Sequence, residues 1–327
     1  MFNRRDVVVG AGAALTAGSL SGGSLPALAQ QDWPNRPLHV YIGFAAGSGA
    51  DILCRWFTTK LQDVSGQTVV IENRPGAVGS IAINVAAKSK PDGYNVLFTG
   101  NTLMAGGRHL LKDFTVDYRR DFDCVCGLVE TPFVLVVGAK SPASSPKDLI
   151  AHLKSKPQNR YGYTNPAAMV AGYALKAYAG VPAEAISYRT TADAMGDLEN
   201  ATLDYMIMDG TFAIGQMKAG KLRVLGATME KRINAMPEVP TMQEGGVPDF
   251  FFSPWWGVWL PKGSPQNANA KLGDWVQQVG KMPETVKFLD GMVAMPVIGD
   301  AKYVLDKLDA DKARWDKLAA AAGLTPQ

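Results

Sequence analysis

The residues most able to bind a ligand lie in a glycine-rich segment near the start of the chain. Residues 44–51 read Phe-Ala-Ala-Gly-Ser-Gly-Ala-Asp and directly follow an apolar run that predicts a strand. Glycines let a backbone approach a ligand closely, and the free N–H groups at the start of a helix attract anions. Ser48 adds a hydroxyl donor, so the segment favours binding of an anion. The alternative is a plain turn in which Asp51 only caps the following helix.

Catalytic chemistry has less support in the sequence. The histidines His39, His109 and His152 lack the spacing of metal ligands, and only His109 falls near a candidate binding segment. Cys54 is predicted on the buried face of a helix, and no Gly-x-Ser-x-Gly elbow is present. We therefore expect no metal and no cofactor. An enzyme is the less favoured alternative, because it would need a nucleophile and a base that meet in one cleft.

Two glycine patterns resemble nucleotide-binding motifs without the required context. Residues 10–14 begin like a dinucleotide fingerprint, yet they follow no strand. Residues 215–221 match most of a phosphate-binding loop, but Leu222 replaces the Ser or Thr that would hold Mg²⁺. A helix is predicted before this segment and a strand after it, which is the reverse of the order that phosphate binding needs. We interpret it as the turn that ends a helix.

The elements that must position the candidate residues alternate between strand and helix. This alternation predicts an α/β fold with mostly parallel sheets and helices on both faces. The best-marked helix covers residues 145–157, with Ser145 as its cap and Pro146 at its first position. Predicted strands occupy residues 38–44, 68–71, 94–98, 133–137, 161–163, 186–188, 205–208, 222–227 and 250–260.

Residues 1–29 have the features of an export signal. Arg4 and Arg5 precede a small, mostly apolar run, and Ala27-Leu28-Ala29 forms a cleavage pattern. The paired arginines suit the twin-arginine route, with the general export route as the alternative. We expect cleavage near Ala29 and a periplasmic protein. No cysteine follows the apolar run to carry a lipid anchor, and no later run reaches the roughly 20 apolar residues of a membrane span.

Composition narrows the class of partner. The 327 residues carry a formal charge of +3, with 47% hydrophobic and 19% charged residues, which is typical of a globular protein. Without a clustered basic face, nucleic acid is not expected as a partner. Of the three cysteines, Cys124 and Cys126 would share one face of a strand, which is poor geometry for a disulfide. We expect all three, including Cys54, to be buried as small apolar residues.

Four separated motifs together resemble one known family. They are residues 72–79 (Glu-Asn-Arg-Pro-Gly-Ala-Val-Gly), residues 91–94 (Pro-Asp-Gly-Tyr), residues 237–246 and residues 256–265. In this order they resemble the Bug-type solute-binding proteins of tripartite tricarboxylate transporters, over a match that runs from about Trp33 to the C-terminus. The resemblance implies a type II periplasmic-binding-protein fold, in which two α/β lobes are joined by two crossing strands. By analogy these strands lie near residues 133–138 and 250–260, which gives one lobe at residues 30–137 and 252–327 and the other at 138–251.

The resemblance also implies a function. A small organic acid would be held in the cleft, captured by hinge closure without chemistry and delivered to integral membrane transporter subunits, with the receptor itself a monomer. A sensory binding protein that reports to a receptor is the alternative. Residues 44–51 resemble the family loop that holds one carboxylate group, partly through ordered water. Asp209 matches a family position that can meet an amine or hydroxyl of the ligand, although it could equally cap a helix.

The second carboxylate loop of the family corresponds to residues 163–168, where this chain departs from the pattern. Ala167 and Ala168 stand where glycine and a hydroxyl residue are expected, and Ala171 where histidine is expected. An aliphatic dicarboxylate is therefore less secure, and an acid with a bulkier or less polar far end is the alternative. Trp255 and Trp256 could line the cleft or belong to the core. The expected ligand-binding residues are Phe44, Ala45, Ala46, Gly47, Ser48, Asp51, Gly100, Asn101, Thr102, Tyr163, Thr164, Asn165, Ala167, Ala168 and Asp209.

Overall fold

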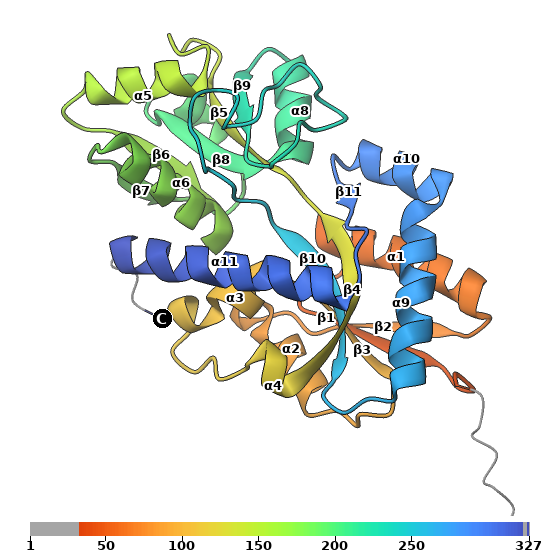
Figure 1. Ribbon diagram of the computed structural model, residues 1–327. Helices are drawn as coiled ribbons and strands as arrows, with labels where there is room; N and C mark the ends of the chain where they lie inside the picture. The colour runs from red at the N-terminus through yellow and green to blue at the C-terminus, as the bar shows by residue number, and fades with distance from the viewer. Residues whose placement is uncertain (1–32, 323–325, 327) are drawn as a thin grey trace, which may run out of the picture. The chain divides into compact units, whose positions relative to one another are not determined.

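The computed structural model describes residues 33–322 and Pro326, so the expected export signal and its cleavage site lie outside the described residues. Within this part of the chain the strands form two separate sheets (Figure 1). The first has six strands in the order β11-β4-β10-β3-β1-β2. Its strands are β1 (Leu38–Ile42), β2 (Val69–Asn73), β3 (Asn95–Gly100), β4 (Phe122–Glu130), β10 (Trp255–Pro261) and β11 (Met295–Pro296).

The second sheet has five strands in the order β7-β6-β8-β5-β9. They are β5 (Phe133–Gly138), β6 (Arg160–Tyr163), β7 (Glu184–Ser187), β8 (Tyr205–Asp209) and β9 (Leu222–Ala227). Both sheets are mixed, which corrects the expectation of mostly parallel sheets. In the first sheet β1 is parallel to β2 and β3, whereas β10 is antiparallel to β3 and β4. In the second, β6 is parallel to β7 and β8, whereas β5 is antiparallel to β8 and β9.

The chain passes between the sheets twice. β4 ends at Glu130 and β5 begins at Phe133, so residues 131–132 make the first passage, and residues 228–254 return the chain from β9 to β10. Residues 133–138, expected as a crossing strand, form β5 as an inner strand of the second sheet. The strand expected at residues 250–260 begins only at Trp255, because the residues before it bridge the two sheets, with Phe252 N–H bonded to the Thr228 carbonyl. The lobe boundaries themselves stay a prediction.

Helices cover both faces of each sheet, as predicted for an α/β fold (Figure 1). Around the first sheet lie α1 (Gly49–Ser65), α2 (Ser80–Ala87), α3 (Asn101–Leu110), α4 (Tyr118–Asp121), α9 (Gln266–Lys281), α10 (Pro283–Gly291) and α11 (Ala301–Ala322). The second sheet is accompanied by α5 (Pro146–Lys154), α6 (Pro166–Ala179), α7 (Met195–Glu199) and α8 (Gly210–Lys218). A short 3₁₀ segment, η1 (Ala77–Gly79), precedes α2. Among the described helices, none is long and apolar enough to span a bilayer.

Local expectations are confirmed where the signals were strongest. The Ser145 hydroxyl accepts a hydrogen bond from Asp148 N–H at 3.1 Å, and Pro146 opens α5. Residues 215–221 end α8, with Gly220 in the left-handed region at φ 68° just before β9. Cys54, Cys124 and Cys126 are buried and free. Burial raises the pKa of all three thiols, that of Cys126 to about 12.

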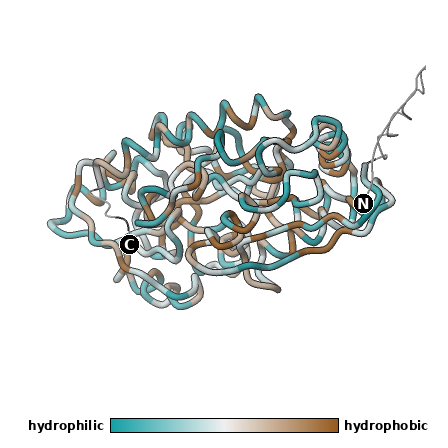
Figure 2. The backbone as a smooth tube through the Cα atoms, turned by 90° about the horizontal axis from the view of Figure 1, so that it is seen from below, coloured by the Kyte–Doolittle hydropathy of each residue, from teal (hydrophilic) through white to brown (hydrophobic). Residues whose placement is uncertain are grey.

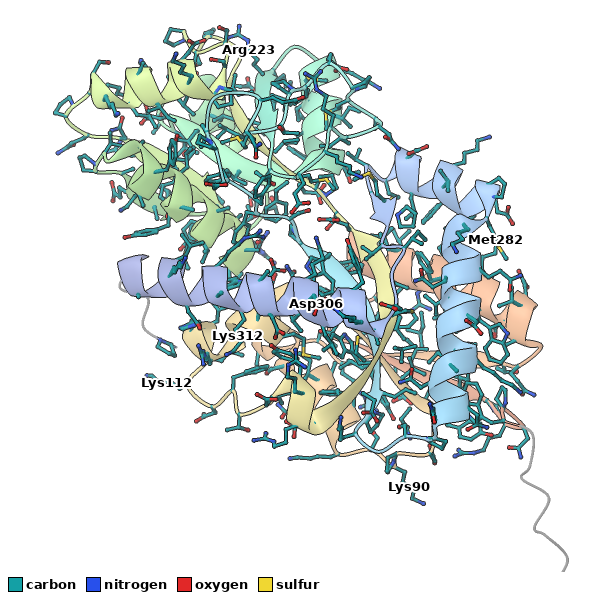
Figure 3. All side chains as sticks on the ribbon, viewed as in Figure 1. Lys90, Lys112, Arg223, Met282, Asp306 and Lys312 are labelled. Atoms are coloured by element: carbon teal, nitrogen blue, oxygen red, sulfur yellow. The ribbon has the colours of Figure 1, made fainter. Side chains whose placement is uncertain are left out.

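The apolar core is divided between the sheets. The inner strands β5 and β10 are buried along their whole length. Figure 2 shows brown, hydrophobic stretches running through the interior of the described part, with teal stretches outside. Charged side chains such as Lys90, Lys112, Asp306 and Lys312 project from the ribbon in Figure 3.

Candidate functional site

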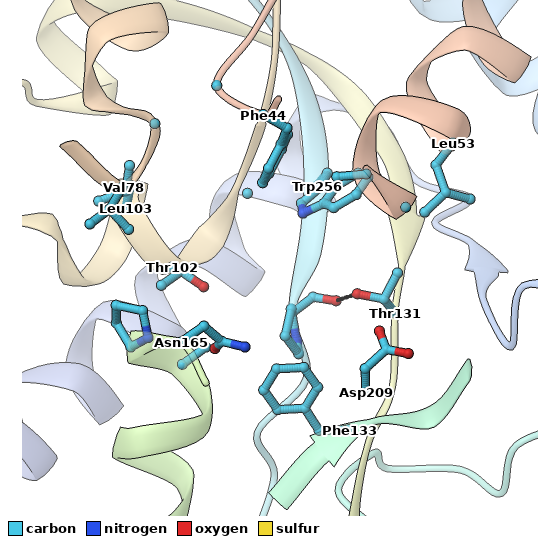
Figure 4. A pocket seen from close by; sticks show the side chains of 18 of the residues that line it. Phe44, Leu53, Val78, Thr102, Leu103, Thr131, Phe133, Asn165, Asp209 and Trp256 are labelled. Atoms are coloured by element: carbon cyan, nitrogen blue, oxygen red, sulfur yellow. Dashed lines mark hydrogen bonds between the residues drawn. The ribbon is translucent and has the colours of Figure 1, made fainter. Parts of the chain in front are cut away.

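A cavity of about 780 Å³ lies where the carboxyl ends of strands from both sheets meet. Gly43 and Phe44 follow β1, Gly100 ends β3 and Asp209 ends β8. Thr131, at the first passage between the sheets, also contributes to the wall. Binding beyond the carboxyl ends of strands is the general rule for α/β sheets. The cavity therefore lies where both sheets can contribute to a ligand site (Figure 4).

Five helices begin at this cavity. Its wall includes Gly49 and Ala50 of α1, Gly79 before α2, Gly100 and Thr102 at the start of α3, Asn165, Pro166 and Ala167 at the start of α6, and Asp209 and Thr211 at the start of α8. The first turn of a helix has N–H groups without partners in the helix and carries a partial positive charge. The helix starts thus give the wall positive partial charges, although the described residues that line it include no Lys, Arg or His.

The helix starts differ in how far their N–H groups are already used. α2 and α3 have no side-chain cap. On the side of the second sheet, Asn165 Oδ1 accepts from Ala168 N–H at 2.9 Å. Asp209 Oδ1 accepts from the N–H groups of Thr211 at 2.8 Å and Phe212 at 3.2 Å. Ser48 caps α1, so α2 and α3 offer the freer donors, and the second sheet offers the one charged side chain of the described wall.

Apolar side chains make up much of the remaining wall. Trp256 lies against Phe44, with ring centroids 5.2 Å apart. Figure 4 shows these two rings near the middle of the view, with Leu53 to one side and Val78 and Leu103 to the other. Phe133, Phe212 and Met292 also line the cavity. Such a wall suits a ligand with a substantial apolar part.

Part of the expected set lines the cavity. The expected residues found in its wall are Phe44, Gly100, Thr102, Asn165, Ala167 and Asp209. The alternatives left open for the two tryptophans divide between them. Trp256 lines the cavity, whereas the Trp255 side chain points into the core and donates to Asp311 at 2.7 Å.

Asp51 forms hydrogen bonds within the glycine-rich loop after β1. Its carboxylate accepts from Gly47 N–H, Arg55 Nε and Asn73 Nδ2, each at 2.8 Å, and it is only 1% exposed. Burial alone would raise the pKa of Asp51, but these hydrogen bonds and the Arg55 charge hold it below its usual value. Ser48 accepts from Asp51 N–H at 3.2 Å. Of this loop, Ala45, Ala46, Gly47, Ser48 and Asp51 are not in the cavity wall, so the loop reaches the cavity through Phe44 and through Gly49 and Ala50 beyond it.

Four other expected residues are not in the wall. Asn101 faces away from the cavity, donating to Asp311 Oδ2 at 2.7 Å and accepting from Trp255 N–H at 3.2 Å. Tyr163 packs beside Tyr161, and Ala168 is a buried residue of α6, 1% exposed. Thr164 precedes the cap of α6 and is likewise outside the wall. A binding role for these residues stays a prediction.

Several wall residues had no signal in the sequence. Thr131 and Thr191 lie in connecting segments, and Met292 follows α10. Val78 belongs to a motif that carried the family resemblance, but nothing in the sequence placed its side chain at the cavity. These positions depend on pairings between distant segments, such as Trp256 opposite Gly100.

Comparison with known proteins points to one group. Residues 53–324 match the family described as tripartite tricarboxylate transporter family receptor. A Pseudomonas sp. protein described as UPF0065 protein in the tcbD-tcbE intergenic region is 30% identical over 324 residues, covering 97% of this chain and 94% of that protein. Protein BugT of Bordetella pertussis is 28% identical over 287 residues, covering 86% of this chain and 88% of its own.

Solved structures point to the same group of proteins. The R. palustris protein Rpa4515, solved with adipate, is 28% identical with a TM-score of 0.77, and the match covers 90% of this chain and 100% of that one. The periplasmic binding protein BugD is 27% identical with a TM-score of 0.73, covering 90% of this chain and 100% of its own. These relatives are binding proteins and not enzymes, in agreement with the expectation from the sequence.

Proposed function

The chain belongs to the tripartite tricarboxylate transporter family of receptors, and we propose that its cavity captures a small organic acid between the two sheets. The lobes carrying the sheets would close around the acid at residues 131–132 and 228–254, and the closed receptor would deliver it to membrane subunits of the transporter. Capture then is an equilibrium between open and closed forms that the ligand shifts.

One observation carries this proposal: five helices begin at a cavity whose described wall holds no basic side chain. Backbone N–H groups at helix starts can bind an anion without a basic side chain. The hydroxyls of Thr99 and Thr102 add donors on the side of the first sheet, whereas the Thr131 hydroxyl donates to the Pro254 carbonyl at 3.3 Å. A carboxylate is an anionic group that fits such a set of uncharged N–H and O–H donors.

The side-chain caps at the helix starts indicate which end of the acid lies beside which sheet. The less capped starts of α2 and α3 favour the carboxylate beside the first sheet. At the other end the Asp209 carboxylate would repel a second carboxylate and accept from a hydroxyl or ammonium group. A hydroxy acid or amino acid with an apolar middle therefore fits better than a dicarboxylate such as the adipate bound to the R. palustris relative.

The test uses a charge placed at the start of α1. Ala50→Asp puts a carboxylate at the second position of the helix, where it suits the helix itself but competes with a bound anion. Asn267→Asp does the same at the second position of α9, which is exposed and away from the cavity. Isothermal titration with 6-hydroxyhexanoate, 6-aminohexanoate and adipate should show binding to the wild type and the α9 variant. For Ala50→Asp we expect affinity to fall at least about tenfold.

Three results would count against the proposal. Equal losses in both variants would mean a general disturbance, and unchanged binding in Ala50→Asp would mean that the helix starts do not hold the anion. Failure of all three acids, followed by failure of a wider panel of organic acids in a thermal-shift screen, would reject organic acids as ligands.

Export would place the receptor in the periplasm. This step depends on residues 1–29, with cleavage near Ala29. Fractionation of cells that express the whole chain should recover a shortened protein outside the cytoplasm. Replacement of Arg4 and Arg5 by lysine should retain it inside if the twin-arginine route is used, and should leave export intact if the general route is used.

A further inference from the structure

Four consecutive residues beside the cavity have positive φ angles. The values are 123° for Gly76, 42° for Ala77, 58° for Val78 and 98° for Gly79. Glycine adopts such angles freely, but an L side chain crowds its own backbone there. For a branched residue such as valine the conformation is an outlier. Val78 is therefore held in a backbone conformation that glycine would adopt without strain.

The surroundings explain how the strain is maintained. Gly79 N–H donates to the Gly76 carbonyl at 2.8 Å, which closes the turn. Gly79 also lies directly against Gly43 at the end of β1, where a Cβ on Gly43 would be 2.6 Å from the Gly79 Cα. The turn is thus fixed between β1 and α2, and Val78 cannot relax without moving the wall of the cavity.

The Val78 side chain faces the cavity and is not used by the fold. It lines the cavity while remaining 47% exposed. Figure 4 shows Val78 beside Leu103 in the view, on the other side of the cavity from Trp256 and Leu53. An apolar side chain at an open wall gains its contact when a ligand covers it. Ala77 has the same left-handed conformation but does not line the cavity, so strain and cavity contact can be separated.

We propose that Val78 is a specificity-determining residue that packs against the apolar middle of the bound acid. Its strained conformation places a branched side chain over the wall where glycine would leave a gap. The receptor thereby prefers acids with an extended carbon chain to compact acids with the same end groups. This inference rests on the proposed capture of an organic acid and assigns the chain-length preference of that site.

The experiment measures affinity along a series of ω-hydroxy acids from three to eight carbons by isothermal titration. In the wild type each methylene that becomes buried should tighten binding by about threefold to fourfold. In Val78→Gly this gain per methylene should shrink, so the longer acids bind about tenfold more weakly and the three-carbon acid binds as before. Ala77→Gly should follow the wild type along the whole series.

The outcomes separate the two proposals. If the wild type binds these acids and Val78→Gly shows the same dependence on chain length, the proposed role of Val78 is overturned. Organic-acid capture would then still stand. A loss of equal size at every chain length would also overturn it, since that indicates a general disturbance of the cavity. If the wild type binds none of the series and no other organic acid, the proposed function fails and this inference with it. Melting temperatures of both glycine variants at or above that of the wild type would confirm that the fold is retained.

Discussion

Gly43 and Gly79 meet backbone to backbone at the edge of the cavity. A Cβ on Gly43 would lie 2.6 Å from the Gly79 Cα and 2.9 Å from its carbonyl oxygen. Such approaches are possible only without a side chain. The contact brings the end of β1 and the turn before α2 together, so that Phe44 and Val78 line one cavity.

Gly43→Ala should therefore destabilise the protein and weaken ligand binding together. Because the clashing atoms are backbone, the turn before α2 must shift, and we expect a loss of about 1–3 kcal/mol in the free energy of unfolding. Urea unfolding measures the loss of stability, and titration with an acid that the wild type binds measures the loss of affinity. Gly215→Ala is the control, since that position lies inside α8 with nothing within 4 Å of a new Cβ. Gly215→Ala should gain about 0.5–1 kcal/mol in the free energy of unfolding from helix propensity. A Gly43→Ala variant as stable as the wild type would contradict the close contact between Gly43 and Gly79.

Asp51 is predicted to make stability depend on pH. Burial raises its pKa, but the hydrogen bonds from Arg55, Asn73 and Gly47 lower it more, so the folded-state pKa lies below the ordinary value. A carboxyl of this kind contributes stability above its unfolded pKa, and that contribution is lost as pH falls through the folded pKa. Asp51→Asn should lose about 1–3 kcal/mol near neutral pH, and the difference from wild type should shrink below about pH 4.

The control for this experiment is Asp63→Asn on the same helix. The Asp63 side chain is 63% exposed and lies 3.9 Å from Lys60. Exposed pairs of this kind contribute about 0–1 kcal/mol. Urea unfolding from pH 7 to pH 3 should thus show a wild-type profile for Asp63→Asn. A difference between Asp51→Asn and wild type that stays constant down to pH 3 would be evidence against the lowered pKa.

Asp311 is predicted to anchor α11 behind the cavity. It is 9% exposed and accepts hydrogen bonds from Asn101 and Trp255, each at 2.7 Å. Asp311→Ala leaves the buried Trp255 N–H without an acceptor and leaves the Asn101 amide only its longer bond to the Ser253 carbonyl at 3.3 Å. We therefore expect a loss of about 2–4 kcal/mol in the free energy of unfolding. Asp306→Ala changes the same residue type on the same helix, but its side chain is 62% exposed. It should change stability by less than about 1 kcal/mol, and similar values for both variants in chemical denaturation would contradict the anchoring role.

The sequence predicted the elements better than the contacts between them. β9 was predicted at residues 222–227, where it is observed, because its apolar run is bounded by a clear glycine turn. The family resemblance, drawn from four motifs, is confirmed by the family match. The strand at residues 250–260 was predicted too long, since aromatic residues favour a strand equally in a sheet and in a segment that bridges two sheets.

At the candidate site, the local sequence pattern identified the candidate binding loops but not the direction in which their side chains point. Gly47 in the glycine-rich loop was expected to be a ligand-binding residue, yet its N–H donates to Asp51. The other oxygen of Asp51 accepts a hydrogen bond from Asn73, which is 22 positions away in the sequence. Likewise, Trp256 reaches the cavity because β10 pairs with β3. Pairings between distant segments depend on tertiary packing, which local propensity does not encode.

Asp209 is predicted to set which group the ligand carries at its second end. Its Oδ1 caps α8, and asparagine is an equally good helix cap, so Asp209→Asn should keep the fold while removing the negative charge. Adipate and 6-aminohexanoate share a carboxylate and a six-carbon chain but differ in the sign of the other end. In the wild type we expect 6-aminohexanoate to bind more tightly, and in Asp209→Asn the ratio of the two dissociation constants should move toward adipate by at least about tenfold.

The control for Asp209 is a second capping aspartate away from the cavity. Asp117 caps α4 and is exposed, so Asp117→Asn removes the same charge from the same type of position without touching the cavity wall. Isothermal titration of both variants with both acids gives the comparison. An equal shift in both variants would mean that only the overall charge matters. A wild-type ratio in Asp209→Asn would mean that the ligand does not reach this carboxylate, and the acid would then be bound by the first sheet alone.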